Sequence, residues 1–296
     1  MVFLIYASYR DLKTRTVDNW VWHVMAWSGF LIMEYQFFTM DFDQRHILFT
    51  LPALILFMFF LTEDYIIYPD GWVNWPWLGL LGVATVMVIY GIFVDGLLGF
   101  NHGDNVRAFL IIIVILVSFM FFQIGLIPGG ADAKAIMAMA FLIPVYPEIG
   151  GFPLLSTSHI STGHWIIERV FPPAITVLFN AVLFMVAIPV AFLIYNISKG
   201  DLKFPACLFG HTMDLSQVPK KHVWLMEGYE EDRHVWIYFP SRRKGQKKML
   251  RTLERKGHTR VWITPKFPFM VPLAMGYLSV FLLGNIMFYI SSLPAS

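Results

Sequence analysis

Runs of apolar residues about as long as a bilayer is thick constrain this chain more than any other feature. A helix needs about 20 residues to cross the hydrocarbon core of a membrane. Runs of this kind recur along the 296 residues, and "VRAFLIIIVILVSFMFFQIG" is one of them. Only 14% of the residues are charged and the mean hydropathy is +0.61, whereas an ordinary soluble domain carries about 25% charged residues. The sequence therefore predicts an integral membrane protein.

The positions of the apolar runs predict a polytopic α-helical membrane protein with about eight spans. We expect these spans near residues 1–10, 19–40, 47–62, 77–98, 106–127, 134–147, 170–197 and 268–291. The first run is too short for a complete crossing, and the run at 134–147 is short and carries two prolines. Some of the spans are therefore expected to be short, broken or tilted.

One polar segment, about 199 to 266, interrupts the apolar pattern before the last helix. "HVWLMEGY" and "RHVWIYFP" are typical of two strands, and "SRRKGQKKMLRTLERKG" predicts a loop followed by a basic amphipathic helix. We expect a small α+β cytoplasmic insertion there, after which "VWITPKFPFMVP" returns the chain to the bilayer. The predicted organisation is a transmembrane domain at 1–198, a soluble domain at 199–266 and a C-terminal transmembrane helix at 267–296.

The distribution of Lys and Arg predicts the orientation. With alternating spans, 19 of the 22 basic residues fall on one side, 15 of them in the insertion. Positive charge marks the cytoplasmic side of a membrane protein. We therefore expect a multi-pass protein of the cytoplasmic membrane in which Asp11 and Asp132 lie at the cytoplasmic ends of two different spans.

Two carboxyl groups at one membrane face can carry out amide hydrolysis if they share one proton. The ionised member then activates water, while the protonated member polarises the carbonyl oxygen or protonates the leaving nitrogen. Gly129 and Gly130, just before Asp132, would let an extended substrate approach closely. Lys134 is most simply an interfacial anchor that reaches lipid headgroups.

Other readings stay open on the residues alone. Asp132 can be a helix cap or half of a structural ion pair. A transporter that relays ions or protons through Asp11 and Asp132 is one alternative. No motif of zinc proteases, P-loop enzymes or α/β-hydrolases is present, and a single cysteine excludes a zinc module of the usual kind.

Three motifs in order resemble those of the type IV prepilin peptidases. "DLKTRTVDNW", which begins at Asp11, resembles the first-aspartate motif, and "GGADAK" resembles the second, GxGD-type motif, with Ala131 in place of a glycine. "VWITPKFPFMVPLAMGYL" is similar to the C-terminal signature of the archaeal prepilin and preflagellin peptidases. The chain thus resembles the archaeal branch of this family over most of its length.

The resemblance implies that Asp11 and Asp132 are the catalytic aspartates of a membrane aspartic endopeptidase. Such enzymes remove the short basic leader of preflagellin and prepilin-like precursors at the cytoplasmic membrane face. Gly129 and Gly130 would be substrate-approach positions, and Asp18 and Lys134 further substrate-binding residues. Glu63, Asp64 and Asp70 are weaker candidates to receive the basic leader. We expect no metal, no cofactor and no nucleic-acid partner; the partners expected are the precursor and the lipid bilayer. A non-catalytic scaffold that binds pilin-like helices through its membrane face is a further alternative to a peptidase.

Overall fold

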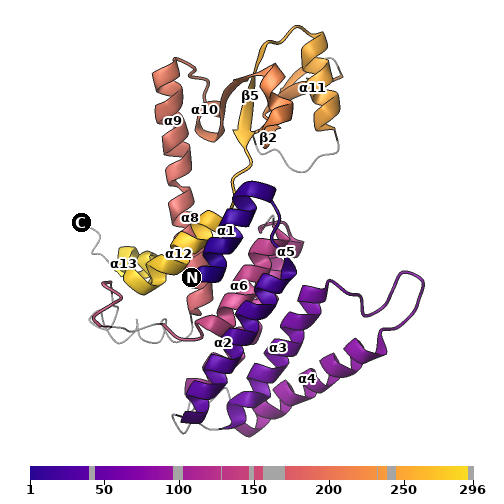
Figure 1. The fold of residues 1–296 in the computed structure, drawn as a ribbon, viewed down its shortest axis with the longest axis vertical. Coiled ribbons are helices and arrows are strands. Elements are labelled where there is room, and N and C mark those ends of the chain that lie inside the picture. Colours follow the sequence, from indigo (N-terminus) through magenta and orange to yellow (C-terminus); the bar gives the residue numbers. More distant parts are fainter. Residues whose placement is uncertain are drawn as a thin grey trace. The chain divides into compact units, whose positions relative to one another are not determined.

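The computed structural model describes residues 1–39, 44–95, 103–127, 129–146, 150–155, 171–231, 233–238 and 245–292. Ribbon elements are shown in Figure 1. The residues form two compact units, unit 1 at Met1–Ala181 and Phe269–Ser296, and unit 2 at Val182–Pro268. Parts of four expected spans lie outside the described residues, namely residue 40 of the second span, 96–98 of the fourth, 147 of the sixth and 170 of the seventh.

Unit 1 is helical. Its helices are α1 (Val2–Thr14), α2 (Asn19–Thr39), η1 (Gln44–His46), α3 (Ile47–Thr62), α4 (Trp75–Asp95), α5 (Gly103–Gln123), α6 (Gly130–Leu142), the first part of α8 (Pro173–Met185), α12 (Met270–Leu282) and α13 (Ile286–Ser292). Four helical stretches of the described chain are long and apolar enough to cross a membrane, at Gln44–Thr62, Trp75–Val94, Asn105–Gln123 and Pro173–Lys199.

The expectation of eight spans is therefore too high, although a helix is found in each predicted region. Helices α1, α6 and α12 have 13 residues each, which is about 20 Å at 1.5 Å per residue. The last predicted span is broken, because α12 ends before Gly284, whose φ of +83° ends the helix, and α13 begins at Ile286. Most of the polytopic helical fold is as predicted, with fewer complete crossings.

Helix α6 is the central helix of unit 1. Every residue from Asp132 to Phe141 is buried, and α6 packs against α2 and α5. A Cβ at Gly29 of α2 would lie 2.7 Å from the backbone of Phe141 and Leu142, so the two helices approach more closely than any side chain there would permit. Alanines along α6 contribute to the same close packing.

Unit 2 combines helices with two small sheets. It contains α9 (Ala187–Lys199), α10 (Ala206–Phe209), β1 (His211–Asp214), η4 (Leu215–Lys220), β2 (Val223–Leu225), β3 (Glu227–Glu230), β4 (Arg233–Trp236), α11 (Gln246–Arg255) and β5 (Arg260–Pro265). One sheet has the order β1-β5-β2 and the other pairs β3 with β4, all antiparallel. The segment predicted as a soluble domain, 199–266, lies within this unit, and its independent folding stays a prediction.

The strand predicted at "HVWLMEGY" is divided between the two sheets at Met226. The Met226 N–H donates to Trp262 O at 3.0 Å, whereas the Met226 carbonyl accepts the N–H of Ile237 at 2.7 Å. The hydrogen bonds of the chain therefore change from β5 to β4 at this residue. The basic helix was predicted correctly and is α11.

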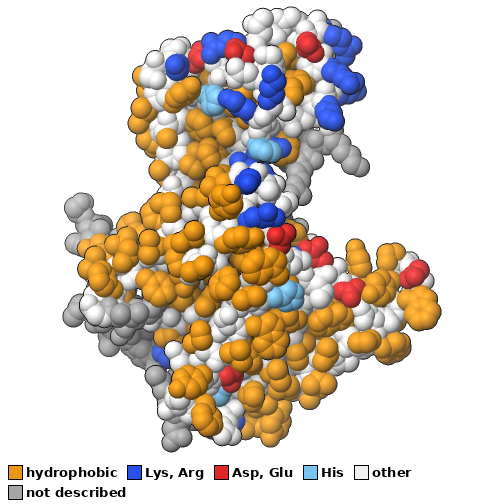
Figure 2. Space-filling view, viewed as in Figure 1, with side chains coloured by type: hydrophobic (Ala, Val, Ile, Leu, Met, Phe, Trp, Pro, Cys, Tyr) orange, Lys and Arg blue, Asp and Glu red, His pale blue; other side chains and the backbone are white. Residues whose placement is uncertain are grey.

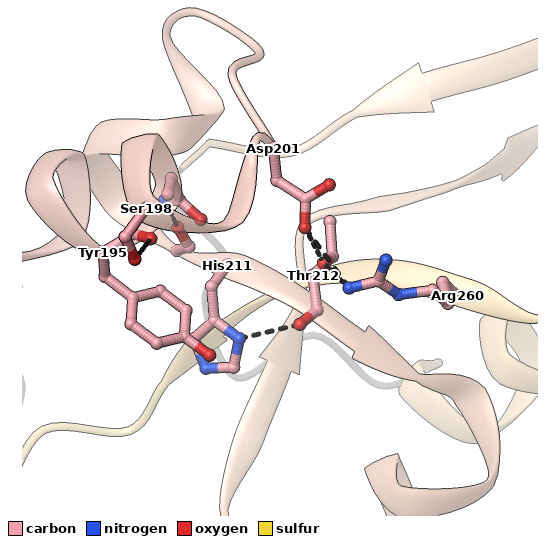
Figure 3. Close-up of polar contacts among 8 residues, drawn as sticks. Tyr195, Ser198, Asp201, His211, Thr212 and Arg260 are labelled. Carbon is pink, nitrogen blue, oxygen red and sulfur yellow. Dashed lines mark hydrogen bonds and ion pairs between the residues drawn. The ribbon is translucent and has the colours of Figure 1, made fainter.

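Strands β1 and β5 were not predicted. We expected "VWITP" only as part of the return to the membrane, but β5 is the central strand of the larger sheet, with Val261, Trp262 and Ile263 buried. Figure 3 shows the polar contacts that join β1 and β5 to the chain after α9. Arg260 Nη2 donates to Asp201 Oδ2 at 3.2 Å, and Thr212 Oγ1 donates to the same carboxylate oxygen at 2.5 Å.

Candidate functional site

The two candidate aspartates come from helices far apart in the sequence and lie in unit 1. Asp11 is in the last turns of α1, and Asp132 is in the first turn of α6. These two helix ends lie at the same end of unit 1 (Figure 1). The charge of Asp11 raises the pKa of Asp132, so the two carboxyl groups are near enough to interact electrostatically.

Asp11 is held against the start of α12. Its Oδ2 accepts the backbone N–H of Met270, the first residue of α12, at 3.4 Å. Ser8, one turn earlier on α1, donates its hydroxyl to Met270 O at 3.0 Å. These two contacts join α1 to α12 and fix the carboxylate beside a helix N-terminus, where backbone N–H groups favour negative charge. Nothing in the sequence pattern predicted that the Met270 N–H would donate to Asp11.

Asp132 has a different environment. Only 7% of its surface is exposed, and within the described chain no hydrogen bond reaches its carboxylate. Helix α6 begins at Gly130 with Gly129 as its N-cap, and no side chain caps it. The reading of Asp132 as a helix cap is therefore wrong. A buried carboxyl group without donors is costly in its charged form.

These surroundings act differently on the pKa of Asp11 and the pKa of Asp132. Both residues lie outside the four long apolar stretches. Burial, assisted by the charge of Asp11, raises the pKa of Asp132 from 3.8 to about 7. Burial also raises the pKa of Asp11, but the Met270 N–H and the Arg15 guanidinium oppose that increase. The arrangement can therefore hold one proton on Asp132 while Asp11 is ionised.

Gly129 packs directly on the side chain of Asp132. A Cβ at Gly129 would lie 2.2 Å from Asp132 Oδ2 and 2.9 Å from its Cγ, whereas a Cβ at Gly130 would meet only the ring of Phe122 at 3.6 Å. The absence of a side chain at 129 is thus required by the aspartate itself. The two glycines, which the sequence analysis treated alike, have different surroundings.

Lys134 is buried, with 8% of its surface exposed. Its ammonium donates to Asn19 Oδ1 at 3.0 Å and forms an ion pair with Glu63. The interpretation of Lys134 as an anchor among lipid headgroups is therefore wrong, because the side chain joins α6 to the start of α2 and the end of α3. The prediction that Lys134 binds substrate stays untested.

The other acidic candidates for leader binding also have partners within the chain. Asp18 is exposed and pairs with Arg10 at 3.1 Å. Asp64 accepts the Tyr68 hydroxyl at 2.7 Å and the Asn74 amide at 3.0 Å, which stabilises the turn between α3 and α4. Asp70 accepts the Trp72 N–H at 3.2 Å. Within the described residues, no cluster of three or more His, Cys, Asp or Glu side chains could hold a metal ion.

Fold and site together define a helical membrane protein with a pair of interacting aspartates at one end of its helices. Residues 202–286 match the family model described as "Archaeal Peptidase A24 C-terminus Type II". This segment contains β5 and the start of α12, the region that resembles the C-terminal signature.

Three curated proteins, each named preflagellin peptidase, are similar to most of the chain. The protein from Methanocaldococcus jannaschii is 28% identical over 69% of this chain and 83% of its own length. The protein from Methanococcus voltae is 27% identical over 72% of this chain and 85% of its own, and that from Methanococcus maripaludis is 25% identical over 75% and 86%. The relationship to archaeal preflagellin peptidases that the motifs predicted is confirmed.

Proposed function

We propose that this protein is a membrane aspartic endopeptidase that removes the basic leader of preflagellin or prepilin-like precursors at the cytoplasmic membrane face. The observation that carries the proposal is that Asp11 and Asp132, which are 121 residues apart in the sequence, lie on helix ends at the same end of unit 1 (Figure 1), near enough for the charge of Asp11 to raise the pKa of Asp132. The similarity to proteins named preflagellin peptidase supports the leader-peptidase role.

The different surroundings of the two aspartates support different roles in the reaction. Asp11, beside the Met270 N–H and Arg15, is the ionised member and takes a proton from the attacking water. Asp132, buried and without donors, keeps the proton and gives it to the carbonyl oxygen or the leaving nitrogen. If Asp132 protonates the carbonyl oxygen, Asp11 then gives its proton to the leaving nitrogen as the C–N bond breaks, and a hydroxyl of the tetrahedral intermediate returns a proton to Asp132. If Asp132 protonates the nitrogen directly, the proton passes from Asp11 to Asp132 after the products leave.

The basic leader would bind at the end of unit 1 that carries Asp11 and Asp132. Glu63, with 70% of its side chain exposed, and Asp18, with 50%, keep carboxylate surface in contact with water despite their ion pairs. A basic leader would compete with Arg10 for Asp18 at modest cost, because exposed ion pairs contribute about 0 to 1 kcal/mol. At Glu63 the leader would bind the exposed carboxylate surface beside the ion pair with buried Lys134. Asp18 and Glu63 are therefore the proposed leader contacts.

The test is cleavage of a precursor by the purified full chain in detergent or lipid. The substrate has a basic leader followed by an apolar helix, and mass spectrometry identifies the products. We expect one cut between leader and helix, and a slower cut when the basic residues of the leader are replaced by glutamine. No cleavage, or a cut elsewhere in the precursor, would contradict the leader-peptidase role.

A further inference from the structure

Unit 2 is strongly basic in a way that the proposed chemistry does not use. Residues 199–266 contain 15 Lys and Arg against 7 Asp and Glu. Figure 2 shows Lys and Arg gathered over the part of unit 2 that contains α11, whereas hydrophobic side chains cover most of the visible face of unit 1. This concentration of one sign of charge raises the local concentration of anions.

Helix α11 has two faces of opposite character. Leu253 is fully buried, and Met249 and Leu250 pack with it against the core of the larger sheet. The solvent-exposed positions include Lys247, Lys248, Arg251 and Arg255. Lys247, Arg251 and Arg255 recur every four residues and therefore share one side of the helix. We call these four residues the basic face of α11.

The four cations of the basic face have a single acidic neighbour on their own helix, three residues after Arg251. Glu254 is the only acidic residue of α11, and none lies in its first turn. Lys247 and Lys248 occupy that first turn, where the helix dipole disfavours cations. Four like charges on a short helix repel one another, so an external anion would stabilise this arrangement.

Contacts within unit 2 place the start of α11 close to the point where the chain leaves the sheet toward α12. Gln246 Nε2 donates to Val223 O at 2.9 Å, and Val223 is paired with Pro265, the last residue of β5. The N–H of Lys266 donates to His222 O at 3.0 Å at the same edge. The first turn of α11 therefore lies at the end of the sheet from which the chain continues to Met270.

The covalent chain limits how far this end can be from the membrane helix that follows. Only five residue steps separate Pro265 from Met270, and fully extended they reach at most about 18 Å. Lys266 lies within this connection, and exposed Lys221 precedes β2 at the same end. Phosphate groups of the bilayer surface are thus the anions that this part of the chain meets at the highest effective concentration.

We propose that the basic face of α11 binds the phosphate headgroups of anionic lipids in the leaflet next to the start of α12. Lys and Arg contribute about 1 kcal/mol each near an anionic membrane surface. Removing two of them is therefore expected to weaken the lipid contact about 30-fold. The contact would hold unit 2 against the bilayer without any new apolar surface.

The experiment uses the full chain in nanodiscs with a dye on Thr252→Cys, a neutral position of α11 outside the basic face. Native Cys207 is 2% exposed and does not compete for the dye. A nitroxide on a small fraction of lipid headgroups quenches the dye when α11 lies at the surface. We expect stronger quenching in discs with about one third phosphatidylglycerol than in discs of phosphatidylcholine alone, and loss of the difference in about 0.5 M NaCl, because salt screens charges.

A matched pair of double variants assigns the effect to the basic face. Lys247→Gln with Arg251→Gln is expected to abolish the difference between the two disc types. Arg233→Gln with Arg260→Gln removes the same charge from elsewhere in unit 2, with Arg260 at the opposite end of β5 from Pro265, and should preserve it. Thermal unfolding of both variants checks the fold.

Three results would overturn the proposal. One is equal quenching in both disc types, and another is equal loss in both double variants. The third is displacement of α11 from anionic discs by about 10 mM inorganic phosphate or by a short RNA at micromolar concentration, which would assign the face to a soluble anion or to nucleic acid. Peptidase activity is not read in this experiment, so its outcome is independent of the proposed function.

Discussion

Gly129 is the residue at which the geometry of the candidate site is most restrictive. At the neighbouring Gly130, the first residue of α6, a Cβ would make only an ordinary contact with the ring of Phe122 at 3.6 Å. The backbone of Gly129, with φ of −106° and ψ of 123°, suits any L-residue. The effect of a side chain at 129 is therefore steric and acts on the carboxylate of Asp132.

Gly129→Ala is expected to reduce cleavage by about 100-fold, because misplacing a catalytic group by about 1 Å has an effect of that size. Gly130→Ala should retain activity within about threefold. Initial rates on one precursor, with unfolding temperatures as the control, decide the comparison. Equal losses in the two variants would mean that the contact with Asp132 is not what matters.

The raised pKa of Asp132 makes stability depend on pH with a definite sign. Its pKa is about 7 in the folded chain against an ordinary 3.8, so folding favours the protonated form. The resulting stability is complete below about pH 4 and is lost as the pH rises through 7. A neutral side chain of the same shape avoids this loss.

We therefore expect Asp132→Asn to be more stable than the wild type at pH 8, and by about 2 to 3 kcal/mol more than at pH 5. Unfolding in detergent at the two pH values measures the difference. Asp18→Asn, at an exposed position, serves as the control and should change stability by less than about 1 kcal/mol. A constant effect of Asp132→Asn across this pH range would refute the assignment of the proton to Asp132.

The two aspartates and their neighbouring glycines were predictable at the residue scale, because ionisable and helix-breaking residues stand out within apolar sequence. The N–H of Met270 and the close contact of Gly129 with Asp132 were not, since both depend on helices that meet only in three dimensions. For the same reason Lys134 was misread, as its partners Asn19 and Glu63 are 115 and 71 residues away.

At the scale of elements, Lys134 joins three helices at the end of unit 1 that carries Asp11 and Asp132. Its ammonium is buried and depends on Glu63, which follows the last residue of α3 in a left-handed conformation with φ of 54°. Removing one partner of a buried charge leaves that charge uncompensated, whereas removing both partners is often nearly neutral.

Glu63→Gln is accordingly expected to lower the free energy of unfolding by about 1 to 2 kcal/mol. Adding Lys134→Met should restore most of this loss, because the buried charge is then gone. A double-mutant cycle in detergent measures the coupling, and Asp70→Asn in the same connection is the control. Additive losses from the two substitutions would show that the pair does not hold the helices together.

The elements themselves were predicted unevenly. Every apolar run contains a helix, because continuous apolar sequence of this length has few other folds in a membrane. Strand β5 was missed because the prolines and the apolar run that follow it were read as one return to the bilayer. Its β-branched residues Val261, Ile263 and Thr264 were the signal for a strand.

At the scale of the whole molecule, the charge distribution and the alternation of helices make a prediction about sidedness. Cysteines introduced at Thr16 and Glu254 should react with an impermeant thiol reagent only from the cytoplasmic side. A cysteine at Phe152, which is 42% exposed, should react only from the outer side. Reaction of Thr16→Cys and Glu254→Cys from opposite sides would refute the proposed orientation.

The number of complete crossings could not be predicted from the whole sequence, since apolar length alone does not reveal where a helix ends. Gly284 ends α12 within an apolar run, and α6 ends at Leu142 before Pro144. Short helices such as α1 and α6 bring Asp11 and Asp132 to helix ends, where carboxyl groups can meet water and substrate.

The central claim is that Asp11 and Asp132 act together in peptide hydrolysis. Its most direct test is the single-turnover rate of precursor cleavage by the wild type, Asp11→Asn, Asp132→Asn and the control Asp214→Asn, an exposed aspartate of β1 in unit 2, all with intact thermal unfolding. The account predicts a loss of at least about 1000-fold in each of the first two variants and a loss below about tenfold in the control. Near wild-type cleavage by either Asp11→Asn or Asp132→Asn would contradict it.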